Sequence, residues 1–228
     1  DSTGSRLQPG RKRSMQKLKS LAIGVGLLLV PTFAMADILA ANFSGHADNG
    51  TGTGGFYAAG SSYDAFLVLN TTQENPWYPF DGTKEYTAVV STTVSSFVVL
   101  GNQEVVDFAI ADVNVYEDDT TPADYANQGT FTDGTNILSG AAQNMIGNRI
   151  SIFGLPFDVT GIIVFDGGDG LGNLDPCIST GLIMNDFIQF AIVSNPPGYE
   201  EAYDAEWKYE CPFGIEEGTW GNLKSLYR

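Results

Sequence analysis

Apolar and polar positions alternate with a period of two along most of the chain. Tyr63–Leu69 is apolar at nearly every position, which is typical of a strand buried on both faces. No stretch of ten residues shows the period of an amphipathic helix. The pattern predicts these further strands: Tyr86–Val90, Val94–Leu100, Val105–Val115 with a bulge near Asp107, Ile150–Phe153, Val159–Phe165 and Leu182–Val193.

Turn residues separate these segments. Asp133-Gly134 predicts a type I′ hairpin between Thr130–Thr132 and Thr135–Leu138, and Asp81-Gly82 predicts a second turn before Tyr86. The glycine-rich stretch Gly45–Gly60 is expected to be an exposed loop near the N-terminus. Short strands with regular turns predict an all-β fold, a single antiparallel β-sandwich or jelly-roll-like domain.

The N-terminal part has the features of an export signal. Lys17 and Lys19 precede the ten-residue apolar run Leu21–Val30, and Ala34-Met35-Ala36 places small residues at the −3 and −1 positions of a cleavage site. Ten apolar residues are too few to cross a bilayer as a helix. We therefore expect a signal peptide over residues 15–36, preceded by upstream or cloning-derived sequence, and a secreted extracellular or periplasmic mature chain without a membrane span.

Composition excludes several classes of function. The chain has 11 Lys and Arg against 27 Asp and Glu, a net charge of −16, which argues against nucleic-acid partners. Its one histidine excludes multi-histidine metal sites and leaves little for Ser-His-Asp chemistry. That residue, His46, stands in the glycine-rich segment and is expected to face solvent. The two cysteines, Cys177 and Cys211, predict one disulfide in an oxidising compartment.

A glycine-rich acidic segment is the candidate metal site. Asp166, Asp169, Asn173 and Asp175 supply oxygen ligands of the kind that Ca²⁺ prefers, and the glycines between them allow a tight loop. The spacing is not that of an EF-hand, because Gly168 occupies the third position. The alternative is a solvated acidic turn between strands. The acids Glu117, Asp118 and Asp119 form a second cluster, for which solvation is the simpler interpretation.

A third acidic segment points to carbohydrate chemistry. Glu200-Glu201-Ala-Tyr203-Asp204-Ala-Glu206 resembles the E-x-D-x-x-E active-site strand of laminarinase-like glycosidases, which implies paired carboxylates as acid and base. Tyr203 stands where that strand has its middle acid, and a shift of one residue moves a carboxylate to the opposite face. The preceding Pro196-Pro197-Gly198 favours a loop.

An aromatic segment is the candidate ligand-binding site. Trp77 and Tyr78 stand in Asn75-Pro-Trp-Tyr-Pro-Phe80, where exposed rings would stack on sugars and neighbouring polar groups would bind hydroxyls. The alternative is an aromatic cap over the open end of the core. In the C-terminal tail, residues 214–228, Thr219 is expected to begin a short helix that docks on this protein or on a partner.

These observations predict a β-sandwich domain over residues 37–213 with a short C-terminal helix or tail. The predicted function is a secreted non-enzymatic extracellular binding or surface-structural protein, calcium-stabilised and binding a glycan or another cell-surface component. One alternative is a secreted carbohydrate-active hydrolase, which a concave sheet lined by acids and aromatic rings would favour. Another is a self-assembling surface or filament subunit, which an unpaired strand edge would favour.

Overall fold

A computed structural model describes residues 37–53, 57–70, 78–150, 156–175, 178, 181–190 and 195–210. All of them belong to one compact unit, residues 35–228. The expected signal peptide, both cysteines, Trp77 and the C-terminal tail lie outside the described residues, so the predictions about them stay predictions. No helix in the described part of the chain is long and apolar enough to cross a membrane.

The described residues form nine strands and two short 3₁₀ helices, which confirms the predicted all-β antiparallel class. The helices are η1 (Gln128–Phe131) and η3 (Leu171–Asn173). The strands are β1 (Asp37–Asp48), β2 (Ser62–Leu69), β3 (Glu85–Leu100), β4 (Gln103–Phe108), β5 (Ala111–Asp118), β6 (Thr135–Ile150), β7 (Phe157–Gly167), β8 (Leu182–Phe190) and β9 (Glu201–Glu210).

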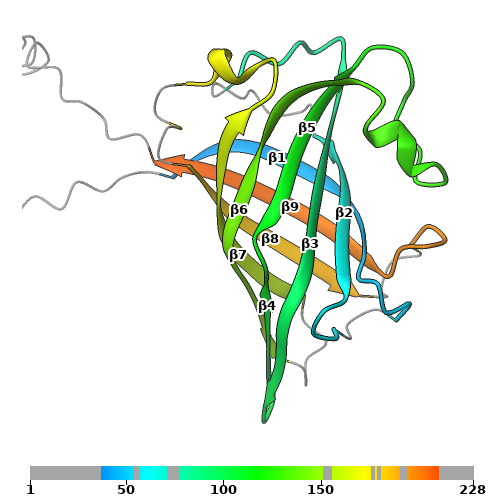
Figure 1. Cartoon of the computed structure of the whole chain (residues 1–228), viewed down its shortest axis with the longest axis vertical. Coiled ribbons are helices and arrows are strands. Elements are labelled where there is room, and N and C mark those ends of the chain that lie inside the picture. Colours follow the sequence, from blue (N-terminus) through cyan, green and yellow to red (C-terminus); the bar gives the residue numbers. More distant parts are fainter. Residues whose placement is uncertain are drawn as a thin grey trace, which may run out of the picture. The chain divides into compact units, whose positions relative to one another are not determined.

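The sheet closes on itself into a barrel (Figure 1). Every strand pairs antiparallel with the strand that follows it around the barrel, and β9 pairs with β1 to complete the circle. β4 and β5 lie one after the other between β3 and β6, so that together they fill one of eight positions. The arrangement is a closed up-and-down barrel rather than the expected sandwich or jelly roll.

Strand continuity explains this difference. A sandwich was expected partly because Tyr86–Val90 and Val94–Leu100 read as separate short strands, whereas both belong to the 16-residue strand β3. A register irregularity between Val94 and Ser96 lets β3 continue past the point where its partner changes from β5 to β4. Long strands twist, and a sheet of such strands can coil until its first and last strands pair. The result is one closed sheet instead of two stacked sheets.

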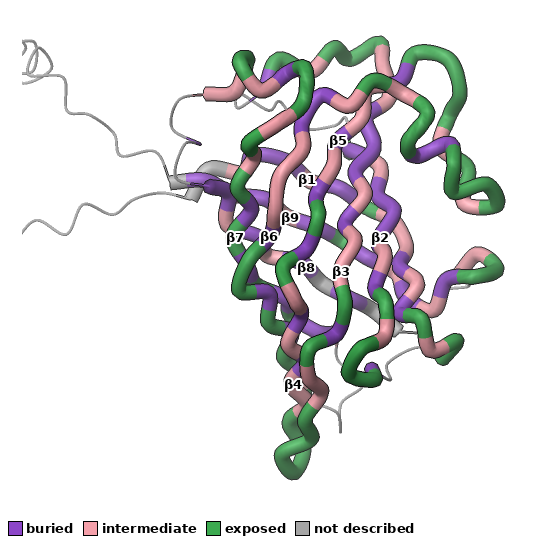
Figure 2. Tube along the Cα trace, in the orientation of Figure 1, coloured by how far each residue is buried: buried purple, intermediate pink, exposed green. Residues whose placement is uncertain are grey.

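The inner face of the barrel is the core. Along β9, Glu201, Tyr203, Ala205, Trp207 and Tyr209 are buried, while Asp204 between them is exposed, and β7 alternates in the same way (Figure 2). The Trp207 ring packs 4.5 Å from the ring of Phe43 on β1. Aromatic rings and small residues alternate on the inner face and fill the barrel with side chains.

A second, smaller cluster lies on the outer face. Phe66 of β2 points away from the barrel interior and packs with Phe131 and Tyr199, covered by the connection between β5 and β6. This cover confirms the expectation that Tyr63–Leu69 is buried on both faces. His46 packs edge-on against Tyr125, with ring centroids 4.7 Å apart, and burial lowers its pKa. It is half-buried rather than solvent-facing.

Three local expectations were wrong. Val105–Val115 is not one bulged strand but parts of two, since β4 ends at Phe108 and β5 begins at Ala111. Thr130–Thr132 is not a hairpin strand, because η1 occupies its start and the Thr87 hydroxyl donates to the Phe131 carbonyl at 2.8 Å, which folds the connection onto β3. Gly45–Asp48 belongs to β1, so the glycine-rich loop begins later than expected. Within that loop Asn49 and Tyr57 are buried. The turn at Asp81-Gly82 is confirmed, since the Lys84 amide donates to the Asp81 carbonyl.

Candidate functional site

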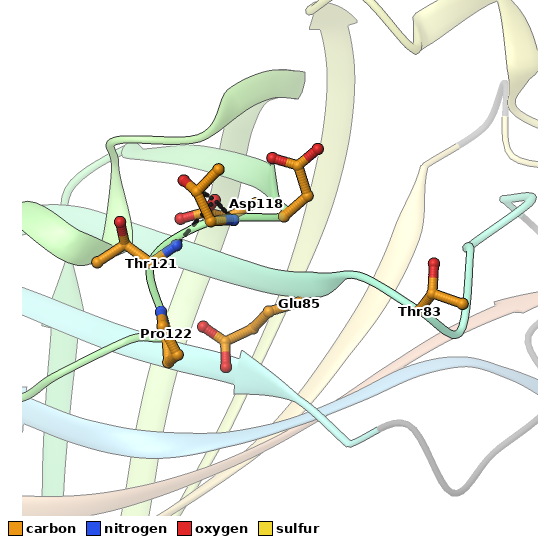
Figure 3. Close-up of a pocket in the computed structure, with 7 residues that line it drawn as sticks. Thr83, Glu85, Asp118, Thr121 and Pro122 are labelled. Carbon is orange, nitrogen blue, oxygen red and sulfur yellow. Dashed lines mark hydrogen bonds between the residues drawn. The ribbon is translucent and has the colours of Figure 1, made fainter.

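A hollow of about 190 Å³ lies at the end of the barrel where β3 begins and β5 ends (Figure 3). We call it the acidic hollow, because three of the seven residues that line it carry carboxylates and none carries a positive charge. Its lining residues are Thr83, Glu85, Asp118, Asp119, Thr120, Thr121 and Pro122.

The strand register brings the carboxylates of the acidic hollow together. Glu85, the first residue of β3, pairs with Asp118, the last residue of β5. After Asp118 the chain turns, and Asp118 Oδ1 accepts hydrogen bonds from the Thr120 amide at 2.7 Å and the Thr120 hydroxyl at 3.0 Å. The Glu85 Oε1 atom accepts the Ala123 amide at 2.6 Å. Backbone amides therefore hold two of the three carboxylates in place.

The acidic hollow has no compensating cation among its lining residues. Lys84 points its ammonium group to Glu117, which also accepts the Tyr86 hydroxyl at 2.9 Å. Asp118 is only 7 % exposed, and its Oδ2 atom receives no hydrogen bond within the described part of the chain. Hydrogen bonding from the Thr120 amide lowers the pKa of Asp118, so this carboxylate is charged at neutral pH.

Asp133 adds a further carboxyl group nearby. Desolvation, followed by its interaction with the Asp118 carboxyl group, raises the pKa of Asp133. Two neighbouring carboxylates repel when both are ionised, which favours the protonated form of Asp133.

Two more carboxylates lie inside the barrel and are enclosed. Glu201 accepts hydrogen bonds from the Tyr57 hydroxyl at 3.0 Å and the Asn49 amide nitrogen at 2.9 Å. Asp186 accepts the Tyr203 hydroxyl at 2.5 Å, and burial raises the pKa of Asp186 well above its ordinary value. Both acids are 0 % exposed. Both carboxylates are therefore enclosed by the barrel and not presented at its surface.

The Glu200–Glu206 segment is a strand and not the expected loop. Its residues alternate in burial because β9 lies between β1 and β8. Asp204 and Glu206 share the outer face, where Asp204 accepts a hydrogen bond from Asn42 at 3.3 Å and Glu206 pairs with Lys208 at 2.8 Å. Glu201 and Tyr203 point to the interior. The segment therefore does not gather its carboxylates on one concave face.

Of the candidate calcium residues, Asp166 belongs to the end of β7, and Asp169, Asn173 and Asp175 lie along the connection between β7 and β8. Asp166, Asp169 and Asn173 are exposed, and Asp175 is half-buried. The Asp169 and Gly170 amides donate to the carbonyls of Asn136 and Ile137, which ties this connection to β6. In the part of the chain that the structure describes, no three His, Cys, Asp or Glu side chains are arranged to hold a metal ion. Calcium binding stays a prediction from the sequence.

Tyr78, one of the two candidate sugar-binding residues, is a core residue. Its side chain is 5 % exposed and its ring centroid lies 4.9 Å from that of Phe80. Phe80 in turn packs edge-on against Tyr86 at 4.7 Å. This position agrees with the cap that was the alternative interpretation of the aromatic segment. Sugar binding at this segment stays a prediction.

Comparison with protein-family models, curated proteins and solved structures found no match. The site must therefore be judged on its own geometry. The acidic cluster at Glu117–Asp119 was visible in the sequence, but Glu85 and the hollow were not, because they depend on the pairing of β3 with β5. The one sequence feature that could have found the hollow is Asp118-Asp119-Thr120-Thr121, a pattern typical of a turn closed by an aspartate side chain.

Proposed function

We propose that this chain is a secreted, non-enzymatic binding protein that holds a cationic group of its ligand in the acidic hollow. The observation that supports the proposal is the set of three carboxylates around one hollow whose lining residues include no base. A protonated amine or a guanidinium group supplies the hydrogen-bond donors that these acceptors lack.

The expected strength follows from elementary electrostatics. A unit charge 4 Å from a carboxylate gains about 1 kcal/mol in water and about 4 kcal/mol in the lower effective dielectric near a protein surface. Two carboxylates acting together on one cation therefore favour binding by an amount that salt reduces. A hollow of about 190 Å³ has room for one side chain or one small group rather than for a whole macromolecule.

The proposal retains the expected cellular location. The proposal also includes three parts that concern other regions of the chain. These are export through the segment 15–36, a disulfide between Cys177 and Cys211, and calcium bound near Asp169. A protein partner on a cell surface that presents a lysine or arginine side chain is a suitable ligand. Glycan binding near Trp77 is a separate proposal, which the buried position of Tyr78 does not support.

The hydrolase alternative is less well supported. It needs two carboxylates that face one substrate on a concave surface. In β9 the outward acids Asp204 and Glu206 lie on the convex side of the barrel, while Glu201 is enclosed. The acidic hollow holds three carboxylates, but at about 190 Å³ it has room for one small group and not for a sugar chain.

The test compares two ligands that differ only in charge. N-acetyl-arginine amide and its neutral isostere N-acetyl-citrulline amide are titrated calorimetrically into the exported protein at low and high salt. We expect the arginine compound to bind more tightly, with an affinity that falls as salt rises. Equal affinity for both compounds would refute the proposal, and so would calcium chloride alone binding more tightly at this hollow.

Variants locate the binding. Asp119→Asn removes one charge from an exposed side chain, and Glu85→Gln keeps an acceptor for the Ala123 amide. Each should weaken binding of the arginine compound by roughly tenfold, which corresponds to about 1.4 kcal/mol. Asp64→Asn, on the outer face of β2 away from the hollow, is the matched control and should bind like the unmodified protein.

A further inference from the structure

β3 extends beyond the strand that pairs with it on one side. β2 pairs with β3 from Val68 opposite Thr87 to Ser62 opposite Thr93, and the last contacts on that side join Val94 to Gly60 and Ser61. Of the next six residues of β3, Ser96–Leu100 pair with β4 on the other side, and Ser95 lies in the register irregularity. Figure 1 shows the β3–β4 hairpin projecting past the end of the barrel.

We call Ser95–Leu100 the free edge. In an antiparallel strand, alternate residues direct their N–H and C=O groups to opposite sides. Among the residues that the structure describes, half of the free edge therefore offers unpaired backbone groups toward the side where β2 has ended. Within the described residues no other segment pairs with this side.

The free edge lacks the side chains that usually protect such strands. Natural edge strands carry lysine, other charges or proline, and these prevent pairing with a second chain. From Thr92 to Gln103 this chain has no charged residue and no proline. Val98, Val99 and Leu100 are 44 %, 56 % and 62 % exposed, among the most exposed large apolar side chains of the described residues. Figure 2 shows the tip of this hairpin as exposed.

We propose that the free edge pairs antiparallel with the same segment of a second copy of this chain. The occupant has to be an extended strand, because the edge offers backbone donors and acceptors at strand spacing. A second copy supplies an identical uncharged apolar strand. Over the rest of the surface the net charge of −16 makes two copies repel, so an uncharged edge is where they can approach.

Pairing of this kind ends at two copies. The same edge serves both partners, so the contact is two-fold symmetric and closes on itself. Each of the remaining strands has a neighbouring strand on both sides over at least part of its length. The structure therefore favours a dimer over the filament that was one alternative interpretation of the sequence.

The test measures association of the exported protein by sedimentation velocity from micromolar to millimolar concentration. We expect a monomer–dimer equilibrium and no larger species. Val98→Lys should abolish the dimer, because lysine on an edge strand places two charges at the junction. Ile162→Lys is the matched control: Ile162 is 43 % exposed on β7, a strand with partners on both sides, and this variant should dimerise like the unmodified protein.

Hydrogen exchange distinguishes strand pairing from side-chain contact. Amides of Ser95–Leu100 should exchange several-fold more slowly at high protein concentration, and this protection should vanish in Val98→Lys. A protein that stays monomeric throughout, a dimer that Val98→Lys leaves intact, or a dimer without added amide protection would each overturn the proposal.

Discussion

The Tyr203 hydroxyl lies 2.5 Å from Asp186 Oδ2, and both side chains are enclosed by the barrel. Burial, the main cause, raises the pKa of Asp186 well above its ordinary value, because a charged carboxylate loses its hydration there. The second oxygen, Oδ1, has no hydrogen-bond partner within the described residues. A single hydrogen bond therefore holds a group that is more stable as the neutral acid.

This pair predicts a pH dependence of stability. Folding raises the pKa of this acid above its value in the unfolded chain, which is about 3.9. The protonated acid therefore stabilises the fold fully below the unfolded pKa, and this contribution is lost as the pH rises through the folded pKa. Across that window the unfolding free energy should fall by about 1.4 kcal/mol per pH unit for the one proton. Asp186→Asn should remove this slope, as urea unfolding at a series of pH values will show. Asp204→Asn, on the exposed face of β9, should leave the slope unchanged.

The contact between Tyr57 and Glu201 predicts a stability change of another kind. Tyr57→Phe keeps the ring, which packs 5.4 Å from Phe157, but removes a hydrogen bond to a fully buried carboxylate. We expect a loss of roughly 1–3 kcal/mol in the free energy of unfolding, measured by urea titration. The control is Tyr116→Phe at a half-buried position. A Tyr57 variant as stable as this control would contradict the structural role of the contact.

Gly168 predicts a local effect in the candidate calcium segment. Its φ is +96°, and a Cβ atom there would lie 2.4 Å from the Ile137 carbonyl oxygen. Gly168→Ala should therefore lower the melting temperature by several degrees, through a backbone cost of about 1–2 kcal/mol and the added clash. Gly172→Ala, where nothing lies within 4 Å of the new atom, is the control and should melt close to the unmodified protein.

Calcium binding near Asp169 predicts a change in thermal stability. If millimolar calcium reaches 10–100 times its dissociation constant, the fold should gain roughly 1.4–2.7 kcal/mol, which is a rise of several degrees in melting temperature. Asp169→Ala should abolish most of that rise. Identical melting curves in calcium and in EDTA would leave the solvated acidic turn as the correct interpretation of Asp166–Asp175.

Strand periodicity made much of the fold predictable. Tyr63–Leu69 and Val159–Phe165 were identified because their alternation is strong and their turns are clear. β9 was read as a loop because Pro196-Pro197-Gly198 precedes it and because it contains few branched apolar side chains. Periodicity also says nothing of partners, so barrel closure through β1 and β9 was not predictable.

The candidate site was less predictable than the fold. Asp118 and Asp119 stood out as adjacent acids, but Glu85 joins them only through the register of β3 against β5. The burial of Glu201 and Asp186 could not be predicted from the sequence for the same reason. A one-residue difference in strand register decides whether an acid faces water or the core. The free edge likewise depends on where β2 begins relative to β3.

The pairing of β1 with β9 has a consequence for how the chain reaches this structure. All other strand contacts join segments that are near each other in sequence, whereas Asn42 and Asp204 at this seam are 162 positions apart. Closing so long a loop has the largest entropic cost of any pairing in the barrel, and it requires that the last strand has already been synthesised. A nascent or truncated chain that lacks β9 presents the edges of β1 and β8 together, and the open sheet is then the species most prone to aggregate.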